Sequence, residues 1–176
     1  MMLSRRKTLV LGGGAFAALV QPRLSSAAAR EVIEMRGTAR GEHIWFSPQG
    51  LAVAVGTTLR FVNRDPGNSH TATAYHESLY GRARRIPAAA TPWDSDFLLP
   101  DEMFETTLNV PGVYDYYCIP HEMGGMLGRI VVGQPGDPGW EGPAADTGDL
   151  TPEALASLPS VEDILASGRV ERESAR

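Results

Sequence analysis

The stretch GVYDYYCIPHEMGGM, residues 112–126, decides the fold of this chain. Its first half is rich in β-branched and aromatic residues, which is typical of a strand over residues 113–119. Its second half contains proline and two glycines, which predict a tight loop. Cys118, the single cysteine of the chain, would therefore end the strand, and His121 and Met126 would belong to the loop. The stretch thus predicts a β-protein whose end loop carries nitrogen and sulfur donors.

Further short runs of β-forming residues lie on both sides of this stretch. Residues 47–50, 65–68 and 110–112 separate several of these runs and are rich in residues that favour turns. Together with 113–119, the expected strands are 31–36, 43–46, 51–55, 58–63, 70–75, 104–110 and 128–132. About eight strands at this spacing predict an all-β fold, an antiparallel β-sandwich of roughly a hundred residues.

Two segments do not follow the strand pattern. Residues 77–100 form a long loop, and loops of this length inside a compact domain are usually functional or disordered. Residues 133–142 are rich in glycine and proline and indicate a linker. Beyond them, Thr151 and Ser160 precede acidic residues in the way that capping residues begin helices. Residues 134–176 have a net charge of −6, so we expect a solvated, partly helical or disordered acidic tail. A docking element for a partner is the alternative.

The amino-terminal residues 1–28 have the pattern of a signal peptide. A basic start precedes an apolar run of about twelve residues and a group of small residues suited to cleavage. The run is shorter than the roughly 20 residues of a membrane-spanning helix, so no stable membrane span is expected in the mature form. Arg5 and Arg6 lie in SRRKTL, which favours a twin-arginine export signal over an ordinary secretory one. These features predict a periplasmic or otherwise extracytoplasmic protein.

The chain that remains after cleavage is acidic and contains one thiol. Without residues 1–28 its formal net charge is −9, which argues against nucleic acid as a partner because phosphates require a basic face. Cys118 has no second cysteine with which to form an intrachain disulfide. In an oxidising compartment such a thiol must be buried, paired between chains, reactive or bound to a metal.

A thiolate, an imidazole and a thioether together form a soft donor set. Such a set favours copper over hard cations such as magnesium or calcium, and methionine is a poor ligand for zinc. Met126 is preferred to Met123 as the thioether, because Gly124 and Gly125 give it room to turn back over Cys118. The loop could therefore supply three donors to one copper ion.

A trigonal copper site also needs a second imidazole from elsewhere in the chain. We favour His70, which follows the turn at residues 66–69 and would lie at the mouth of the next strand. His76 would lie about 20 Å further along an unbroken strand. His43 has no loop context that recommends it, so His43 and His76 are interpreted as ordinary polar histidines.

Residues 47–132 resemble the small blue copper proteins, the cupredoxins, and within them the plastocyanin, pseudoazurin and halocyanin group. The similarity rests on Asn68-Ser69-His70, on residues 112–121 and on residues 125–132. It implies a cupredoxin-like Greek-key β-sandwich over residues 29–133, with residues 134–176 as linker and tail. It also implies a type 1 copper site with His70, Cys118 and His121 as equatorial ligands and Met126 as the weak axial ligand. Thr71 departs from the pattern, since many relatives have asparagine after the first histidine.

The resemblance implies a carrier of single electrons rather than an enzyme. In copper oxidases and nitrite reductases a histidine beside the cysteine leads to a second copper centre, whereas Tyr117 and Ile119 flank Cys118 here. A copper chaperone or storage protein without redox shuttling is the alternative function. The chain is expected to be a monomer. Its expected partners are a redox protein donor and acceptor, which would bind through a transient interface near His121. Pro120, Met123 and Leu127 are expected to line that interface.

Overall fold

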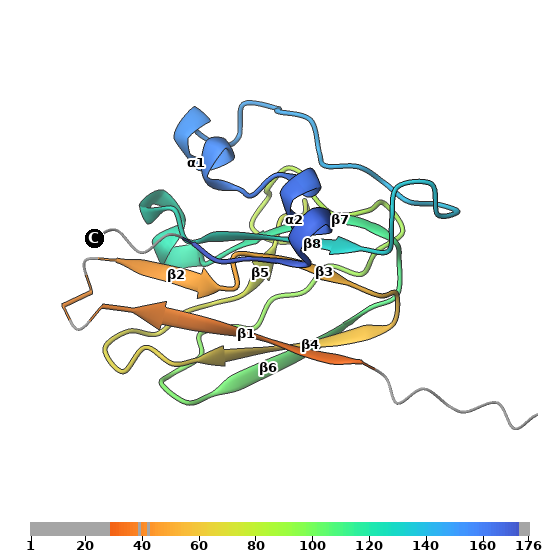
Figure 1. Ribbon diagram of the computed structural model, residues 1–176. Helices are drawn as coiled ribbons and strands as arrows, with labels where there is room; N and C mark the ends of the chain where they lie inside the picture. The colour runs from red at the N-terminus through yellow and green to blue at the C-terminus, as the bar shows by residue number, and fades with distance from the viewer. Residues whose placement is uncertain (1–28, 39, 42, 173–176) are drawn as a thin grey trace, which may run out of the picture.

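The computed structural model describes residues 29–38, 40, 41 and 43–172, and they form two stacked β-sheets (Figure 1). The first sheet contains four strands, with bounds β1 Arg30–Gly37, β2 Ile44–Ser47, β4 Thr57–Asn63 and β6 Met103–Leu108. The second contains five, with bounds β3 Gly50–Val53, β5 Thr73–Ala74, β7 Gly112–Tyr117, β8 Leu127–Val132 and β9 Arg169–Val170. The all-β sandwich predicted from the sequence is confirmed, whereas the predicted signal peptide at 1–28 lies outside the described residues.

The strand pairing differs from the antiparallel arrangement that the sequence predicts. The sheet orders are β2-β1-β4-β6 and β5-β7-β8-β3-β9. β1 runs parallel to β4, and β3 runs parallel to β8, while the other pairs are antiparallel. Parallel neighbours require a crossover connection, which the alternation of residues along a single strand does not reveal.

Side chains of β7 alternate between the core and the outer face of the second sheet, where Asp115 forms buried ion pairs with Arg85 and Arg129. Tyr114 and Tyr116 point into the core between the sheets, where Tyr116 packs against Phe46 with ring centroids 4.7 Å apart. Val113 and Tyr117 belong to two other apolar clusters, formed with residues of the carboxy-terminal segment. All six residues of β7 are buried as a result. This strand is therefore covered on both faces, and it lies between β5 and β8 in the second sheet.

The 77–100 loop completes the core and supports the chain beside β5. Trp93 is buried and stacks on Phe61, with ring centroids 6.5 Å apart. The end of the loop runs antiparallel to residues 70–74 through main-chain hydrogen bonds, including a reciprocal pair between His70 and Leu98 of 3.1 and 2.8 Å. The long loop is thus a structural support for His70.

The carboxy-terminal segment lies over the outer face of the second sheet (Figure 1). Helices α1, Pro152–Ser157, and α2, Val161–Ser167, begin after the caps Thr151 and Ser160, as predicted. The tail is partly helical, as predicted, and most of residues 134–149 are exposed. It is not wholly solvated, however, since the fully buried Ile164 packs against Val113 and Val131 and β9 pairs with β3. No helix among the described residues is long and apolar enough to cross a membrane.

Candidate metal centre

The turn after β7 brings two of the predicted donors next to Cys118. Residues 119–126, here called the ligand loop, begin with a 3-10 helix over Ile119–Gly124 and end at Met126. The amide of His121 donates to the Cys118 carbonyl at 3.0 Å, and the amide of Met126 donates to the His121 carbonyl at 3.2 Å. The amide of Cys118 donates in turn to the Met126 carbonyl at 3.1 Å. These bonds fold the loop into a compact closure over the end of β7.

His70 reaches the same place from a segment distant in sequence. The Leu98 pairing holds its main chain, and its Nε2 lies 3.0 Å from a carboxylate oxygen of Asp65. Asp65 is itself held, because its carboxylate accepts hydrogen bonds from the Gly67 amide and the Asn68 side chain. With Nε2 occupied by Asp65, the ring turns its Nδ1 towards Cys118. Such an outer contact fixes the orientation of a metal-ligating histidine.

Three donor atoms form a small triangle in the interior. The Nδ1 atoms of His70 and His121 are 3.1 Å apart, and they lie 3.6 and 3.4 Å from the Cys118 Sγ. A point equidistant from these atoms is about 2 Å from each, close to the length of a bond from a transition-metal ion to an imidazole nitrogen. His70 and Cys118 are fully buried, and His121 is half-buried. The size and chemistry of this triangle therefore fit one soft metal ion.

The ionisation of the donors follows from their burial. Burial lowers the pKa of both His70 and His121, so the imidazoles are held in the neutral form that binds metals. Burial raises the pKa of the Cys118 thiol to about 11, against the opposing effect of the Thr71 amide. A metal cation at this place would favour the thiolate, because a coordinating thiol is deprotonated.

Met126 and Met123 occupy opposite environments. Met126 is fully buried in the same core cluster as Cys118, whereas Met123 is 86% exposed. The preference for Met126 is therefore consistent with its position in the fold. His43 is exposed and His76 hydrogen-bonds Ser78, and neither belongs to the donor cluster formed by His70, Cys118 and His121.

Thr71 connects the two segments that carry the donors. Its amide donates to the Cys118 Sγ at 3.3 Å, and its Oγ1 accepts the Ile119 amide at 2.9 Å. Its hydroxyl also lies 3.0 Å from that of Thr73, whose proton goes to the Asp94 carboxylate. Thr71 must therefore donate its hydroxyl proton to Thr73. The donor and the acceptor of each hydrogen bond from Ile119 to Asp94 are fixed in this way. Although Thr71 stands where many relatives have asparagine, it still links the two donor-bearing segments by hydrogen bonds.

Sequence reasoning missed several residues that position these donors. Asp65 lies in the Asp-Pro-Gly turn before His70, and a carboxylate five residues before a candidate ligand was the available signal. Asp94 lies in the middle of a long loop and had no comparable signal. The residues expected to line the interface near His121 also need correction. Leu127 is buried beneath the tail, whereas Pro120 is exposed.

Comparison with known proteins places this geometry in a family. Residues 33–133 match the family model for copper binding proteins of the plastocyanin/azurin family. The chain is 30% identical over 94 residues to a chloroplastic plastocyanin of Hordeum vulgare, covering 53% of this chain and 58% of that one. It is 33% identical over 91 residues to a chloroplastic plastocyanin of Physcomitrium patens, covering 49% of each. The chain thus spans between about half and three fifths of the length of these relatives.

Among solved structures, the native pseudoazurin of Hyphomicrobium denitrificans is 27% identical. The match covers 61% of this chain and 77% of that chain, with a TM-score of 0.47. The family match extends over more than half of the chain and includes all four candidate ligands. This chain therefore belongs to the plastocyanin/azurin family of copper-binding proteins, in which copper is the cofactor and His70, Cys118, His121 and Met126 form the candidate type 1 site.

Proposed function

We propose that this chain is an exported carrier of single electrons that holds one copper ion through His70, Cys118, His121 and Met126. The observation that carries the proposal is the buried triangle of two imidazole nitrogens and one thiol sulfur, closed by a loop in which Met126 is buried. When bound there, copper supplies a one-electron couple between Cu(II) and Cu(I). The family consists typically of electron carriers, which supports this function over catalysis.

The chain's own contribution is to hold the donors and to exclude water. Asp65 and the Leu98 pairing fix His70, while Thr71 fixes the chain on either side of Cys118. Ligands held from outside the metal change little between its two oxidation states, which is what rapid electron exchange requires. These contacts make the proposed site a preorganised one.

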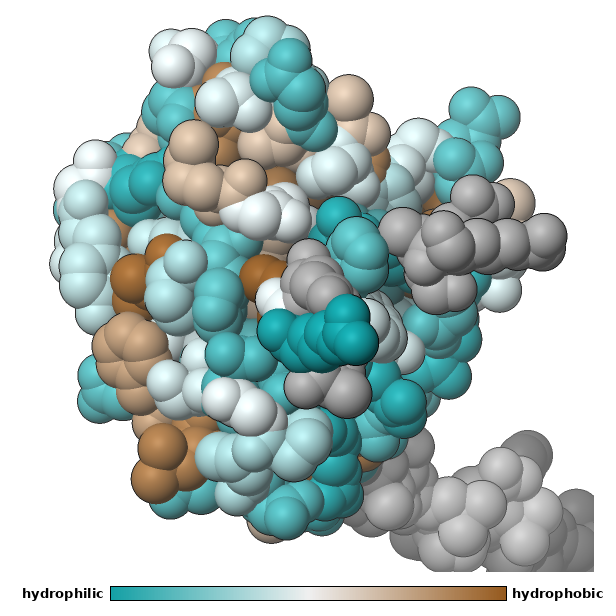
Figure 2. Space-filling model, turned by 90° about the vertical axis from the view of Figure 1, so that its left-hand side faces the viewer, coloured by the Kyte–Doolittle hydropathy of each residue, from teal (hydrophilic) through white to brown (hydrophobic). Residues whose placement is uncertain are grey.

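The route for electrons would pass through His121. Its Nδ1 faces Cys118 and the residue is half-buried, so the opposite ring edge is the part of the site nearest to solvent. Met123 is exposed in the same loop, and the exposed Phe97 and Leu99 flank the residue that pairs with His70. Figure 2 views the end of the molecule that carries the ligand loop, where hydrophobic and hydrophilic side chains are interspersed. Such a surface suits the small transient interface of redox partners.

Export and monomeric state are also part of the proposal. The support for export is the pattern of residues 1–28, which a signal peptidase would remove from the domain at 29–133 and the tail at 134–176. The support for a monomer is that the single thiol is buried, which keeps it from forming a disulfide with a second chain. The acidic charge of the mature chain supports a protein partner over nucleic acid.

A spectrum of the copper-loaded protein tests the proposed function. Residues 29–176 are purified, loaded with copper(II) and measured by visible absorption and EPR before and after ascorbate. An intense blue or green band that bleaches on reduction and disappears in Cys118→Ser is the expected result. A spectrum unchanged by Cys118→Ser would remove the site. A colourless complex formed only with copper(I) would favour the chaperone or storage alternative.

A further inference from the structure

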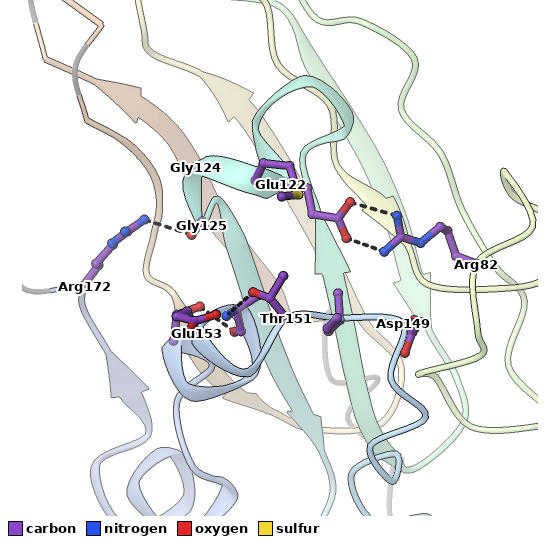
Figure 3. A pocket seen from close by; sticks show the side chains of 12 residues that line it. Arg82, Glu122, Gly124, Gly125, Asp149, Thr151, Glu153 and Arg172 are labelled. Atoms are coloured by element: carbon purple, nitrogen blue, oxygen red, sulfur yellow. Dashed lines mark hydrogen bonds and ion pairs between the residues drawn. The ribbon is translucent and has the colours of Figure 1, made fainter.

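Two arginines from outside the sandwich hold the ligand loop at different points. Arg82 comes from the 77–100 loop and contacts Glu122, while Arg172 follows β9 and contacts Gly125 (Figure 3). In Figure 3 they approach the ligand loop from opposite sides. The ligand loop and the tail also line a cavity of about 330 Å³ between them. Both contacts fall within the residues that connect the candidate donors His121 and Met126.

The contact between Arg82 and Glu122 is a bidentate ion pair. Arg82 Nη1 donates to Glu122 Oε2 at 2.8 Å, and its Nη2 donates to Oε1 at 2.5 Å. The hydroxyl of the buried Tyr75 donates to the same Oε1 at 2.7 Å. The Glu122 side chain is 13% exposed and that of Arg82 is 24% exposed, so solvent screens this pair less than a surface pair. Two parallel bonds restrict orientation as well as distance.

Arg82 is in turn held on an aromatic surface. Tyr75 and Tyr117 stack with ring centroids 4.3 Å apart, and the Arg82 Cζ lies 5.3 and 5.4 Å from the two centroids. A guanidinium on aromatic faces gains cation–π energy and loses rotational freedom. Tyr117 immediately precedes Cys118 in the chain. The ion pair therefore ties the ligand loop to the strand that carries the thiol.

Arg172 secures the other end of the loop. Its Nη1 donates to the Gly125 carbonyl at 2.9 Å and to the Ile44 carbonyl, at the start of β2, at 3.2 Å. Gly125 has φ of 77°, a left-handed conformation that glycine adopts without steric cost. The Gly125 amide donates to the Glu122 carbonyl at 2.8 Å, so the residues gripped by the two arginines are also bonded to each other.

We propose that Arg82 and Arg172 are positioning residues that hold the ligand loop in its closed form before any metal binds. The inference rests on the proposed function, because its consequence is that His121 and Met126 are already placed for copper. Both arginines belong to segments outside the predicted strands, the long loop and the tail. These segments thereby acquire a role at the candidate metal centre.

Hydrogen exchange of the metal-free mature chain tests the proposal without reference to copper. The amides of Gly125 and Met126 report closure, because each donates to a carbonyl inside the ligand loop. Losing a charge-assisted bond should raise exchange at both amides about tenfold or more in Arg82→Gln and in Arg172→Gln. Arg82→Lys should recover only part of the protection, since an ammonium cannot reproduce the two-pronged contact.

A matched control separates loop positioning from general stability. Arg30 forms an exposed ion pair with Glu105 at 3.6 Å on the first sheet, so Arg30→Gln should leave both loop amides unchanged. The amide of Ile130 in β8 serves as the internal reference. Glu122→Gln, which keeps the size of the side chain and an acceptor for Tyr75, provides a second variant should Arg82→Gln fold poorly.

The outcomes decide the role of each arginine separately. Unchanged exchange at Gly125 and Met126, or an increase that is equal at Ile130, overturns the role of the arginine that was replaced. Fast exchange at both amides in the unaltered metal-free chain overturns the whole proposal. With copper(II) added, the EPR hyperfine splitting and the reduction potential of Arg82→Gln should differ from those of Arg30→Gln. A chain that binds no copper refutes the proposed function but leaves the exchange result interpretable.

Discussion

Replacing Thr71 by valine tests the hydrogen bonds that the Thr71 hydroxyl makes beside the Cys118 thiol. Valine has nearly the same shape and fills the same buried space, but it lacks the hydroxyl group. The change therefore removes the acceptor of the Ile119 amide and the donor to Thr73. The Thr71 amide, which donates to the Cys118 Sγ, belongs to the main chain and remains.

The expected loss of stability follows from the two bonds removed. A lost hydrogen bond between neutral groups costs about 1 kcal/mol, and a buried donor left without a partner costs about 1–3 kcal/mol. Ile119 is only partly buried, so its amide falls at the low end of that range. The sum is about 2 kcal/mol, which for a domain of this size lowers the melting temperature by roughly 4–8 °C.

Urea unfolding of the metal-free protein measures this loss. The control is Thr58→Val, because Thr58 makes a similar hydroxyl contact of 2.9 Å with Thr107 on the surface of the first sheet. Thr58→Val should change the free energy of unfolding by less than about 0.5 kcal/mol. Copper-loaded Thr71→Val should still show the thiolate band, since the amide bond to sulfur survives. If Thr71→Val were as stable as the unaltered protein, the hydrogen bonds assigned to the Thr71 hydroxyl would be refuted.

Three other perturbations have defined outcomes. Asp65→Ala frees the Nε2 of His70 and should weaken copper binding about 10- to 100-fold in competition with a chelator, whereas an unchanged affinity would contradict the positioning role. Ile164→Ala should lower the free energy of unfolding in urea by about 2–5 kcal/mol, because Ile164 is fully buried. Leu165 is half-buried, so Leu165→Ala should lower it less, and equal losses would contradict the docking of the tail. Burial raises the pKa of Tyr114 to about 12, above the value near 10 of an exposed tyrosine, so its stabilising contribution should be complete below about pH 10 and lost as the pH rises through about 12. Urea midpoints at about pH 9 and about pH 11 measure this loss, which should shrink in Tyr114→Phe.

The sequence by itself determined the features that depend on near neighbours in the chain. The spacing of Cys118, His121 and Met126 around Pro120 and two glycines is local, so the donor-bearing turn could be read directly. Most strands followed from residue type and from turn residues between them, because both signals act within a few residues. The exceptions are β5, which keeps only Thr73–Ala74 of the expected strand 70–75, and β9, which lies in the expected tail. The caps Thr151 and Ser160 also act on amides only three positions away, and both helices begin there.

Only the tertiary structure decided the contacts between distant segments. His70 and Cys118 are 48 residues apart, and their approach depends on the sheet order and on the pairing of His70 with Leu98. The sequence indicated only weakly that the outer face of β7 is covered. Val113 and Tyr117 place apolar side chains on that face, where a strand exposed to solvent would have polar ones. Nothing local showed that the tail and the 77–100 loop supply that cover and reach the ligand loop. A charged side chain such as Arg82 or Arg172 suits solvent as well as a buried partner, and only the folded chain places that partner within reach.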